Sequence, residues 1–161
     1  IGIESAMTGH KVLSTLHTND AAGAVTRFIE MDLEPFLISS TILVVIAQRL
    51  VRRICPDCIE PFEAQPVQVK AMGVSAGSKM HFFRGKGCFK CDNSGFKGRM
   101  GVYEILENDE MIQDLILRKA SSHEIKRAAI QAGTLKTLKM DAAHKVFEGQ
   151  TTFEQFTLVA F

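Results

Sequence analysis

Residues 12–20, VLSTLHTND, begin with apolar and β-permissive side chains and end in four consecutive polar ones. Val12, Leu13 and Leu16 fall within a short run that predicts a strand over residues 11–17, buried in a sheet. The polar side chains then lie where this strand leaves the core. The stretch therefore predicts a sheet whose strand end carries polar groups.

Helices are predicted on both sides of this strand. Residues 3–7 have the character of a helix tail that Gly9 closes. Asn19 or Asp20 can cap a second helix, expected over about residues 21–31, because either side chain accepts from the first free amides. A helix–strand–helix order favours an α/β architecture.

A longer helix is predicted over residues 35–54. Its apolar run, residues 36–47, is shorter than the roughly 20 residues of a membrane span, which favours a buried core helix. Arg49, Arg52 and Arg53 would project from one face of that helix. They either complement the helix dipole or bind an anion or a partner.

Differences in apolar periodicity and in proline and glycine content divide the chain into three predicted parts. Regular apolar periodicity ends near residue 54, and prolines and glycines are frequent over residues 55–99. We therefore expect residues 1–54 to form part of an α/β core, 55–99 an inserted small module, and 100–161 a return strand with a helical subdomain.

The third part begins with a strand over residues 101–106. Its alternation predicts Val102, Glu104 and Leu106 on one face and Tyr103 with Ile105 on the other. The helices that follow have recognisable starts and stops. The predicted starts are Asn108 or Asp109, the capping box of Ser121 with Glu124, and the capping box of Thr152 with Gln155. Gly133 is a predicted stop, and a further helix is expected over about residues 135–148, with Gly149 after it.

Composition and charge exclude several classes of protein. The 161 residues are 46% hydrophobic and 23% charged, enough for one globular domain, alone or with a small appendage. The net charge of +1 gives no overall nucleic-acid footprint. No secretory signal is recognisable, which favours the cytosol, and the initial Ile indicates a fragment of something longer.

Four cysteines form two C-x-x-C pairs, Cys55 with Cys58 and Cys88 with Cys91. Two such turns can complete the tetrahedral sulphur shell that zinc favours. A thiol oxidoreductase motif is the alternative, but it needs a reactive cysteine at a helix N-terminus. A four-sulphur site is closed to substrate, so it predicts stability without catalysis, and His81 is a lesser candidate ligand.

No complete catalytic motif is recognisable. The nearest approach to a phosphate-binding loop, residues 73–79, has the wrong spacing. In open α/β sheets, however, ligands bind beyond the carboxyl ends of strands, where Ser14, Thr15, His17 and Thr18 are expected. His17 is then either a phosphate contact or a structural side chain.

Four segments resemble the secretion ATPases that drive type II secretion and type IV pilus assembly. They are TGHKVLSTLHTNDA (8–21), EPFLISSTILVVIAQRLVRRICPDC (34–58), GFKGRMGVYEIL (95–106) and EGQTTFEQ (148–155). The resemblance covers essentially the whole chain, and its tetracysteine module is similar to that of the assembly and secretion branch. It does not distinguish secretion from pilus assembly.

The resemblance implies the C-terminal part of a RecA-like P-loop ATPase domain, with an inserted zinc module and a helical C-terminal subdomain. It implies a homo-hexameric, cytoplasmic motor that uses Mg²⁺ and ATP. That motor would be peripheral to the inner membrane through a platform protein and a cytoplasmic recruitment protein. The Walker A and Walker B motifs are expected upstream, so this fragment is not expected to be active alone.

Site residues follow from the same resemblance. His17 matches the histidine-box residue that couples the γ-phosphate state to domain movement, and His10 occupies an earlier position of that box. The implied nucleotide contacts are Thr15, Thr18, Asn19, Gln48 and Arg49, and the implied zinc ligands are Cys55, Cys58, Cys88 and Cys91. One departure is Asp141-Ala142, where relatives often have Asp-Gly, and an ordinary helix is expected there.

Two other functions remain open. The chain could be a zinc-stapled docking module that binds a membrane platform protein without catalysis of its own. Nucleic-acid binding through Arg49, Arg52 and Arg53 is less favoured, because no aromatic side chains alternate with these arginines.

Overall fold

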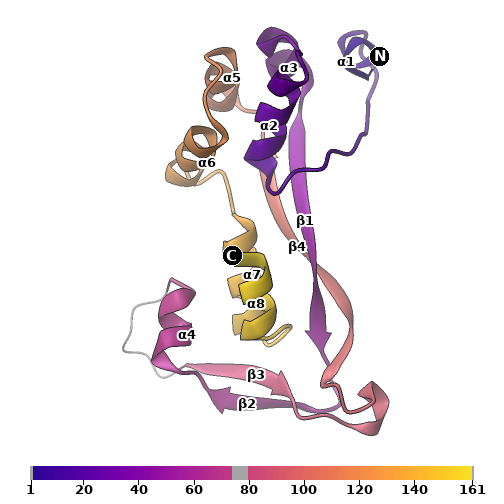
Figure 1. The fold of residues 1–161 in the computed structure, drawn as a ribbon, viewed down its shortest axis with the longest axis vertical. Helices are drawn as coiled ribbons and strands as arrows, with labels where there is room; N and C mark the ends of the chain where they lie inside the picture. The colour runs from indigo at the N-terminus through magenta and orange to yellow at the C-terminus, as the bar shows by residue number, and fades with distance from the viewer. Residues whose placement is uncertain (1, 74–79, 161) are drawn as a thin grey trace. The chain divides into compact units, whose positions relative to one another are not determined.

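The computed structural model describes residues 2–73 and 80–160 (Figure 1). The chain is α/β, and it forms two compact units. The first unit comprises Ile1–Ala47 with Glu104–Thr137, and the second comprises Gln48–Tyr103 with Leu138–Phe161. None of the helices within the described ranges has the length and apolar character needed to cross a membrane.

The first unit is mainly helical. Its helices are α1 (Gly2–Met7), α2 (Ala21–Glu30), α3 (Pro35–Thr41), α5 (Glu110–Leu117) and α6 (Ser122–Gln131). α3 packs against α5, and α2 packs against α6. Val25, Ile38, Ile112, Ile116 and Ile125 are buried together in its hydrophobic core.

Two long strands, β1 (Val44–Ile54) and β4 (Phe96–Glu107), are hydrogen-bonded neighbours. The boundary between the units falls within both strands. Val102, Glu104 and Leu106 are buried, whereas Tyr103 and Ile105 are exposed, so the alternation predicted for this strand is confirmed.

The second unit contains the cysteine module and the C-terminal helices. Its elements are β2 (Ile59–Glu63), α4 (Pro66–Ala71), β3 (His81–Gly85), the short 3₁₀ helix η1 (Phe89–Cys91), α7 (Leu138–Phe147) and α8 (Phe153–Ala160). β2 and β3 pair antiparallel. Phe82 on β3 is fully buried, with its ring centroid 5.9 Å from that of Phe147 and 6.2 Å from that of Phe153. Aromatic packing therefore attaches the module to α7 and α8.

The strand predicted over residues 11–17 is wrong. This segment has no regular structure, and the side chain of Leu13 is 98% exposed. A strand needs a neighbour to satisfy its backbone groups. In the described part of the chain β1 pairs with β4 and β2 with β3, so residues 11–17 pair with neither sheet.

The helix predicted over residues 35–54 is correct only as far as Thr41. Ile42 is already extended, and β1 begins at Val44. The residues at this change are largely β-branched, which favours a strand. Arg49 and Arg53 therefore lie on one face of a strand and Arg52 on the other. The prediction that the three arginines share one helix face, and the prediction that they complement a helix dipole, are both wrong.

Most of the predicted helix ends are confirmed. The Asp20 carboxylate accepts from the Gly23 N–H at 2.8 Å at the start of α2. Asp109 caps α5 and Ser121 caps α6 through equivalent bonds. α7 continues through Ala142, as expected for an ordinary helix at that position. The three-part division at residues 54 and 99 stays a prediction.

Candidate functional site

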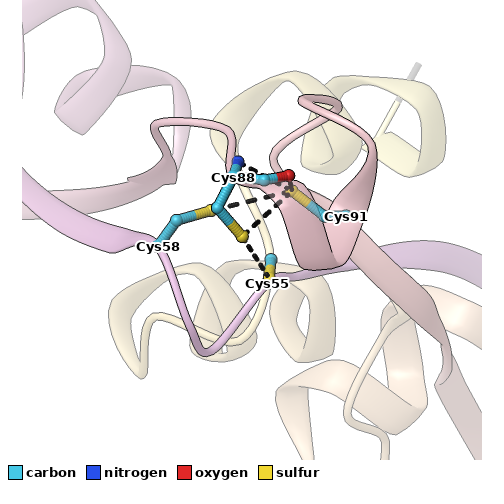
Figure 2. Close-up of side chains that lie close together, drawn as sticks. All are labelled: Cys55, Cys58, Cys88 and Cys91. Carbon is cyan, nitrogen blue, oxygen red and sulfur yellow. Dashed lines mark hydrogen bonds between the residues drawn. The ribbon is translucent and has the colours of Figure 1, made fainter.

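Four cysteine thiols converge in the second unit. Cys55 follows β1, Cys58 precedes β2, and Cys88 and Cys91 lie at the two ends of η1. All four are free, and their sulphur atoms lie within 4.8 Å of one another (Figure 2). The predicted clustering of the two C-x-x-C pairs is confirmed.

The sulphur spacing fits a tetrahedral metal site. The Sγ atoms of Cys55 and Cys88 are 3.9 Å apart, those of Cys58 and Cys91 3.8 Å, and those of Cys88 and Cys91 3.7 Å. Four sulphurs at the zinc–thiolate bond length of about 2.3 Å would be separated by about 3.8 Å. The donor set and its geometry therefore fit zinc.

Two glycines allow the cysteine turns to approach each other. A Cβ atom on Gly85 would lie 2.0 Å from the carbonyl oxygen of Gly95, which is far inside van der Waals contact. The same carbonyl accepts from the Cys55 N–H at 3.0 Å. The Lys86 N–H donates to the Cys58 carbonyl at 3.0 Å. The segments that carry the two cysteine pairs are thus joined by their backbones.

The thiols of Cys58 and Cys91 differ in acidity when no metal is bound. Burial raises the pKa of the Cys58 thiol to about 12. Burial also acts to raise the pKa of Cys91, but N–H groups of Cys88 and Gly95 donate to its sulphur and lower that pKa to about 6. Cys91 is therefore the more acidic of these two thiols, and a divalent cation would favour deprotonation of all its thiol ligands.

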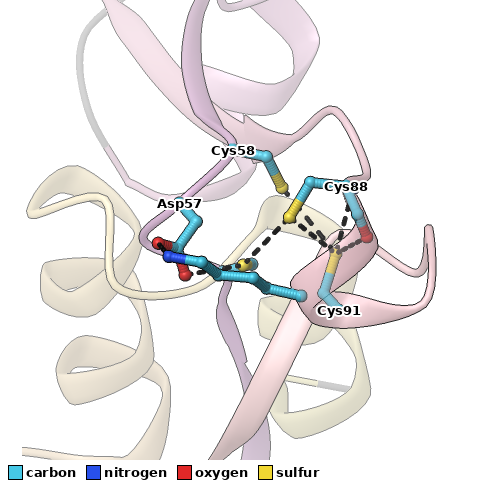
Figure 3. A network of polar contacts seen from close by, with 6 residues as sticks. Asp57, Cys58, Cys88 and Cys91 are labelled. Carbon is cyan, nitrogen blue, oxygen red and sulfur yellow. Dashed lines mark hydrogen bonds and ion pairs between the residues drawn. The ribbon is translucent and has the colours of Figure 1, made fainter.

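An ion pair lies beside the cluster. Asp57 lies beside the cysteines (Figure 3). Lys90 donates to one carboxylate oxygen of Asp57, and the other oxygen is 4.0 Å from the sulphur of Cys55. The hydrogen bond from Lys90 lowers the pKa of Asp57, and the same bond raises the pKa of Lys90. The positive charge of Lys90 is thereby held near the sulphurs, where it can offset thiolate charge.

The sequence reasoning missed this ion pair, although a signal was present. Asp57 and Lys90 occupy the same position of the two C-x-x-C turns, with opposite charges. His81, the lesser candidate ligand, lies at the start of β3 in register with Glu63. Within the described ranges, the metal-ligand cluster comprises the four cysteines without it.

The predicted histidine-box residues lie along an exposed segment of the first unit. His10 follows α1, and its Nδ1 is 3.0 Å from the Thr8 hydroxyl. Thr15, His17 and Asn19 are exposed. The Thr18 hydroxyl donates to the Asp20 carbonyl at 3.1 Å. The segment therefore ends in a fixed helix cap, while its nucleotide role stays a prediction.

The other two predicted nucleotide contacts belong to the second unit. Gln48 and Arg49 are exposed on β1. The Gln48 amide donates to the Tyr103 hydroxyl at 3.2 Å on the neighbouring strand. Their role at a nucleotide also stays a prediction.

Sequence reasoning also missed the surroundings of Glu104. This carboxylate is fully buried and accepts from the Ala21 N–H at 2.9 Å. The signal was a charged residue on the apolar face of a strand, between Val102 and Leu106.

Comparisons with known proteins agree with this architecture. Residues 1–158 match the family described as "Type II/IV secretion system protein". Over 96% of its length, the chain is 44% identical to the type II secretion system ATPase E of Vibrio cholerae and 43% identical to the type II secretion system protein E of Pseudomonas aeruginosa. It covers 30% of each.

A pilus protein and a solved structure are also similar. The chain is 41% identical, over 96% of its length, to the type IV pilus assembly ATPase PilB of Thermus thermophilus, and covers 18% of that relative. The fold matches the ATPase DotB of Legionella pneumophila with a TM-score of 0.60 at 21% identity, over 98% of this chain and 34% of that one. The chain belongs to the type II/IV secretion system protein family.

Proposed function

We propose that the full-length protein is a motor that hydrolyses ATP to power type II secretion or type IV pilus assembly. The observation that carries this proposal is identity above 40% along nearly the whole chain to relatives named as ATPases of both systems. Because the chain spans less than a third of these relatives, the activity is proposed for the whole protein. This chain would contribute the segment around His17, as a sensor of nucleotide, and the module that contains the four cysteines.

His17 is the proposed sensor of the γ-phosphate. Its exposed side chain precedes the capped start of α2, so the imidazole is free to reach a ligand while its C-terminal neighbours are held. Phosphoryl transfer depends mainly on positioning and electrostatic stabilisation. His17 would report bound γ-phosphate and bias a two-state domain movement, with His10, Thr15, Thr18 and Asn19 in supporting contacts.

Zinc is the proposed ligand of Cys55, Cys58, Cys88 and Cys91. The convergence of four thiols and their sulphur spacing support this assignment. A closed four-sulphur zinc site supplies structural stability and leaves no position for substrate. The metal would therefore hold the module's fold and take no part in ATP hydrolysis.

His17→Ala in the full-length protein tests the sensor. We expect lower ATP turnover together with lower pilus or secretion output. The matched control is His123→Ala, because His123 is an exposed histidine on α6 outside the histidine box. Wild-type turnover and output for His17→Ala would refute the sensor assignment.

A docking role for the cysteine module is the second candidate. Phe89, between Cys88 and Cys91, is 94% exposed, and an exposed aromatic side chain of this kind is typical of binding surfaces. In this proposal the cytoplasmic motor, assembled as a homo-hexamer, contacts an inner-membrane platform protein and a recruitment protein. It would then be peripheral to that membrane.

Phe89→Ala separates docking from catalysis. If the module docks, the variant binds the platform protein more weakly and keeps its ATP turnover. Unchanged binding would remove Phe89 from the docking surface. Zinc content near zero in freshly purified protein would contradict the metal assignment.

A further inference from the structure

The first unit contains a fully buried carboxylate on a strand. Glu104 lies on the buried face of β4, between Val102 and Leu106, with a relative exposure of 0%. A buried charge costs several kcal/mol unless it is paired and hydrogen-bonded. Its partners therefore decide what the side chain does.

The first partner of Glu104 is the N-terminus of α2. The N–H of Ala21, the first residue of that helix, donates to Glu104 Oε1 at 2.9 Å. The free amides and dipole of a helix N-terminus stabilise negative charge. This bond fixes the start of α2 to the strand.

The second partner of Glu104 is Lys126 on α6. The ammonium of Lys126 is 3.4 Å from Glu104 Oε2 and donates to Asp20 Oδ2 at 2.8 Å. Burial acts to lower the pKa of Lys126, but the Asp20 hydrogen bond and the Glu104 charge outweigh it, so the pKa is raised. Lys126 therefore bridges two carboxylates and stays charged at neutral pH.

Asp20 completes the network. Its second oxygen, Oδ1, accepts from the Gly23 N–H at 2.8 Å, and its carbonyl accepts from the Thr18 hydroxyl. A Cβ atom on Gly23 would lie 2.9 Å from Oδ1, so a side chain there would press on the cap. Asp20 and Ala21, which follow His17 by three and four residues, are thus held by groups from α6 and β4.

The side chains of Lys126 and Asp20 are 30% and 29% exposed, and ion pairs contribute little net stability whether they are exposed or buried. A role in positioning accounts better for three charged residues held together here. We propose that Glu104, Lys126 and Asp20 position the segment that carries His17, residues 17–19, and couple it to α6. These are positioning residues, and the inference rests on the proposed sensor role of His17.

In the proposed coupling, a change at His17 on binding γ-phosphate moves Asp20 and with it Lys126. The reverse also holds, since a coupling free energy acts equally in both directions. α6 would then transmit the nucleotide state to the rest of the helical part of the first unit. No covalent step is involved.

The test is a double-mutant cycle in the full-length protein. Lys126→Met keeps the aliphatic stem and removes the charge. We expect its kcat for ATP to fall about 2- to 30-fold, the range of mutations that alter coupling, with KM unchanged. In the His17→Ala background the same change has no further effect, because the coupling it removes is already lost.

Three further variants make the test specific. Arg127→Met, at an exposed site next along α6, is expected to keep wild-type kcat. Lys126→Arg is expected to restore most of the turnover. Glu104→Gln keeps an oxygen acceptor for the Ala21 N–H and replaces Lys126→Met if that variant fails to fold.

Independent, multiplying effects of His17→Ala and Lys126→Met, a change in KM alone, or an equal loss in Arg127→Met would overturn the coupling. If kcat falls in His17→Ala but not in Lys126→Met, the coupling is refuted and the proposed sensor role of His17 stands. Wild-type turnover for His17→Ala removes the sensor, and the coupling with it.

Discussion

Gly85 and Gly95 show how single residues shape the cysteine module. Their backbones are so close that a Cβ on Gly85 would overlap the Gly95 carbonyl. Gly98 is different, because its φ is +78° and no atom lies within 4 Å of where its Cβ would be. One position is restricted by space and the other by backbone conformation.

Alanine substitutions of Gly85 and Gly98 separate the effect of close backbone approach from the effect of a positive φ. We expect Gly85→Ala to destabilise the protein by about 2–4 kcal/mol through displaced backbone, and Gly98→Ala by about 1–2 kcal/mol through left-handed strain. Urea unfolding of both variants measures the difference. An equal or larger loss for Gly98→Ala would show that close approach is not the dominant restriction.

The convergence of the four cysteines could be predicted from the sequence, because two C-x-x-C turns imply one shared set of metal ligands. The buried position of Glu104 could be predicted as well, since it alternates with Val102 and Leu106. Its partners could not. Ala21 and Lys126 are distant in sequence, and nothing local to either indicates a shared carboxylate.

At the scale of elements, the start of α8 supports β1. The fully buried Thr151 hydroxyl donates to the Arg52 carbonyl at 2.7 Å, and the Gln155 side chain accepts from the Arg52 N–H at 2.8 Å. Gln155 was predicted to close a capping box with Thr152. Its backbone N–H does donate to the Thr152 hydroxyl, but its side chain binds the strand.

Thr151→Val tests this support. Valine keeps the shape of threonine and removes the donor, leaving the Arg52 carbonyl without this bond, so we expect a loss of about 1–3 kcal/mol. Thr157→Val is the control, because that hydroxyl bonds within α8 at an exposed site and its loss should cost less than about 0.5 kcal/mol. Thermal unfolding measures both, and equal stabilities would contradict the support.

Element prediction succeeded where the signal was local. The capping bonds of Asp20, Asp109 and Ser121 each reach a backbone N–H three residues later, so the local sequence contains both partners of the bond. It failed at residues 11–17, where a strand requires a neighbour from elsewhere in the chain. It also failed after Thr41, where apolar residues on alternate faces of β1 were attributed to a core helix.

At the scale of the whole molecule, the two units are stabilised differently. The first unit has a contiguous aliphatic core. The second depends on aromatic packing around Phe82 and on the four-cysteine cluster. A structural metal would therefore matter most to the second unit.

Removing the metal with a chelator should affect the units unequally. At a free zinc concentration about 100 times the dissociation constant, binding stabilises the folded form by about 2.7 kcal/mol. Hydrogen exchange that requires opening of the zinc site is then about 100-fold slower than in the metal-free protein. We expect hydrogen exchange to accelerate in β2 and β3 on chelation and to change little in α5 and α6. Equal acceleration in all four, or none, would contradict this division.

ATP turnover by the purified full-length protein with Mg²⁺ tests the motor assignment most directly. We expect turnover above the uncatalysed background, which His17→Ala lowers and His123→Ala leaves unchanged. A folded, zinc-loaded protein that binds its platform partner and hydrolyses no ATP would contradict the motor and leave the docking function.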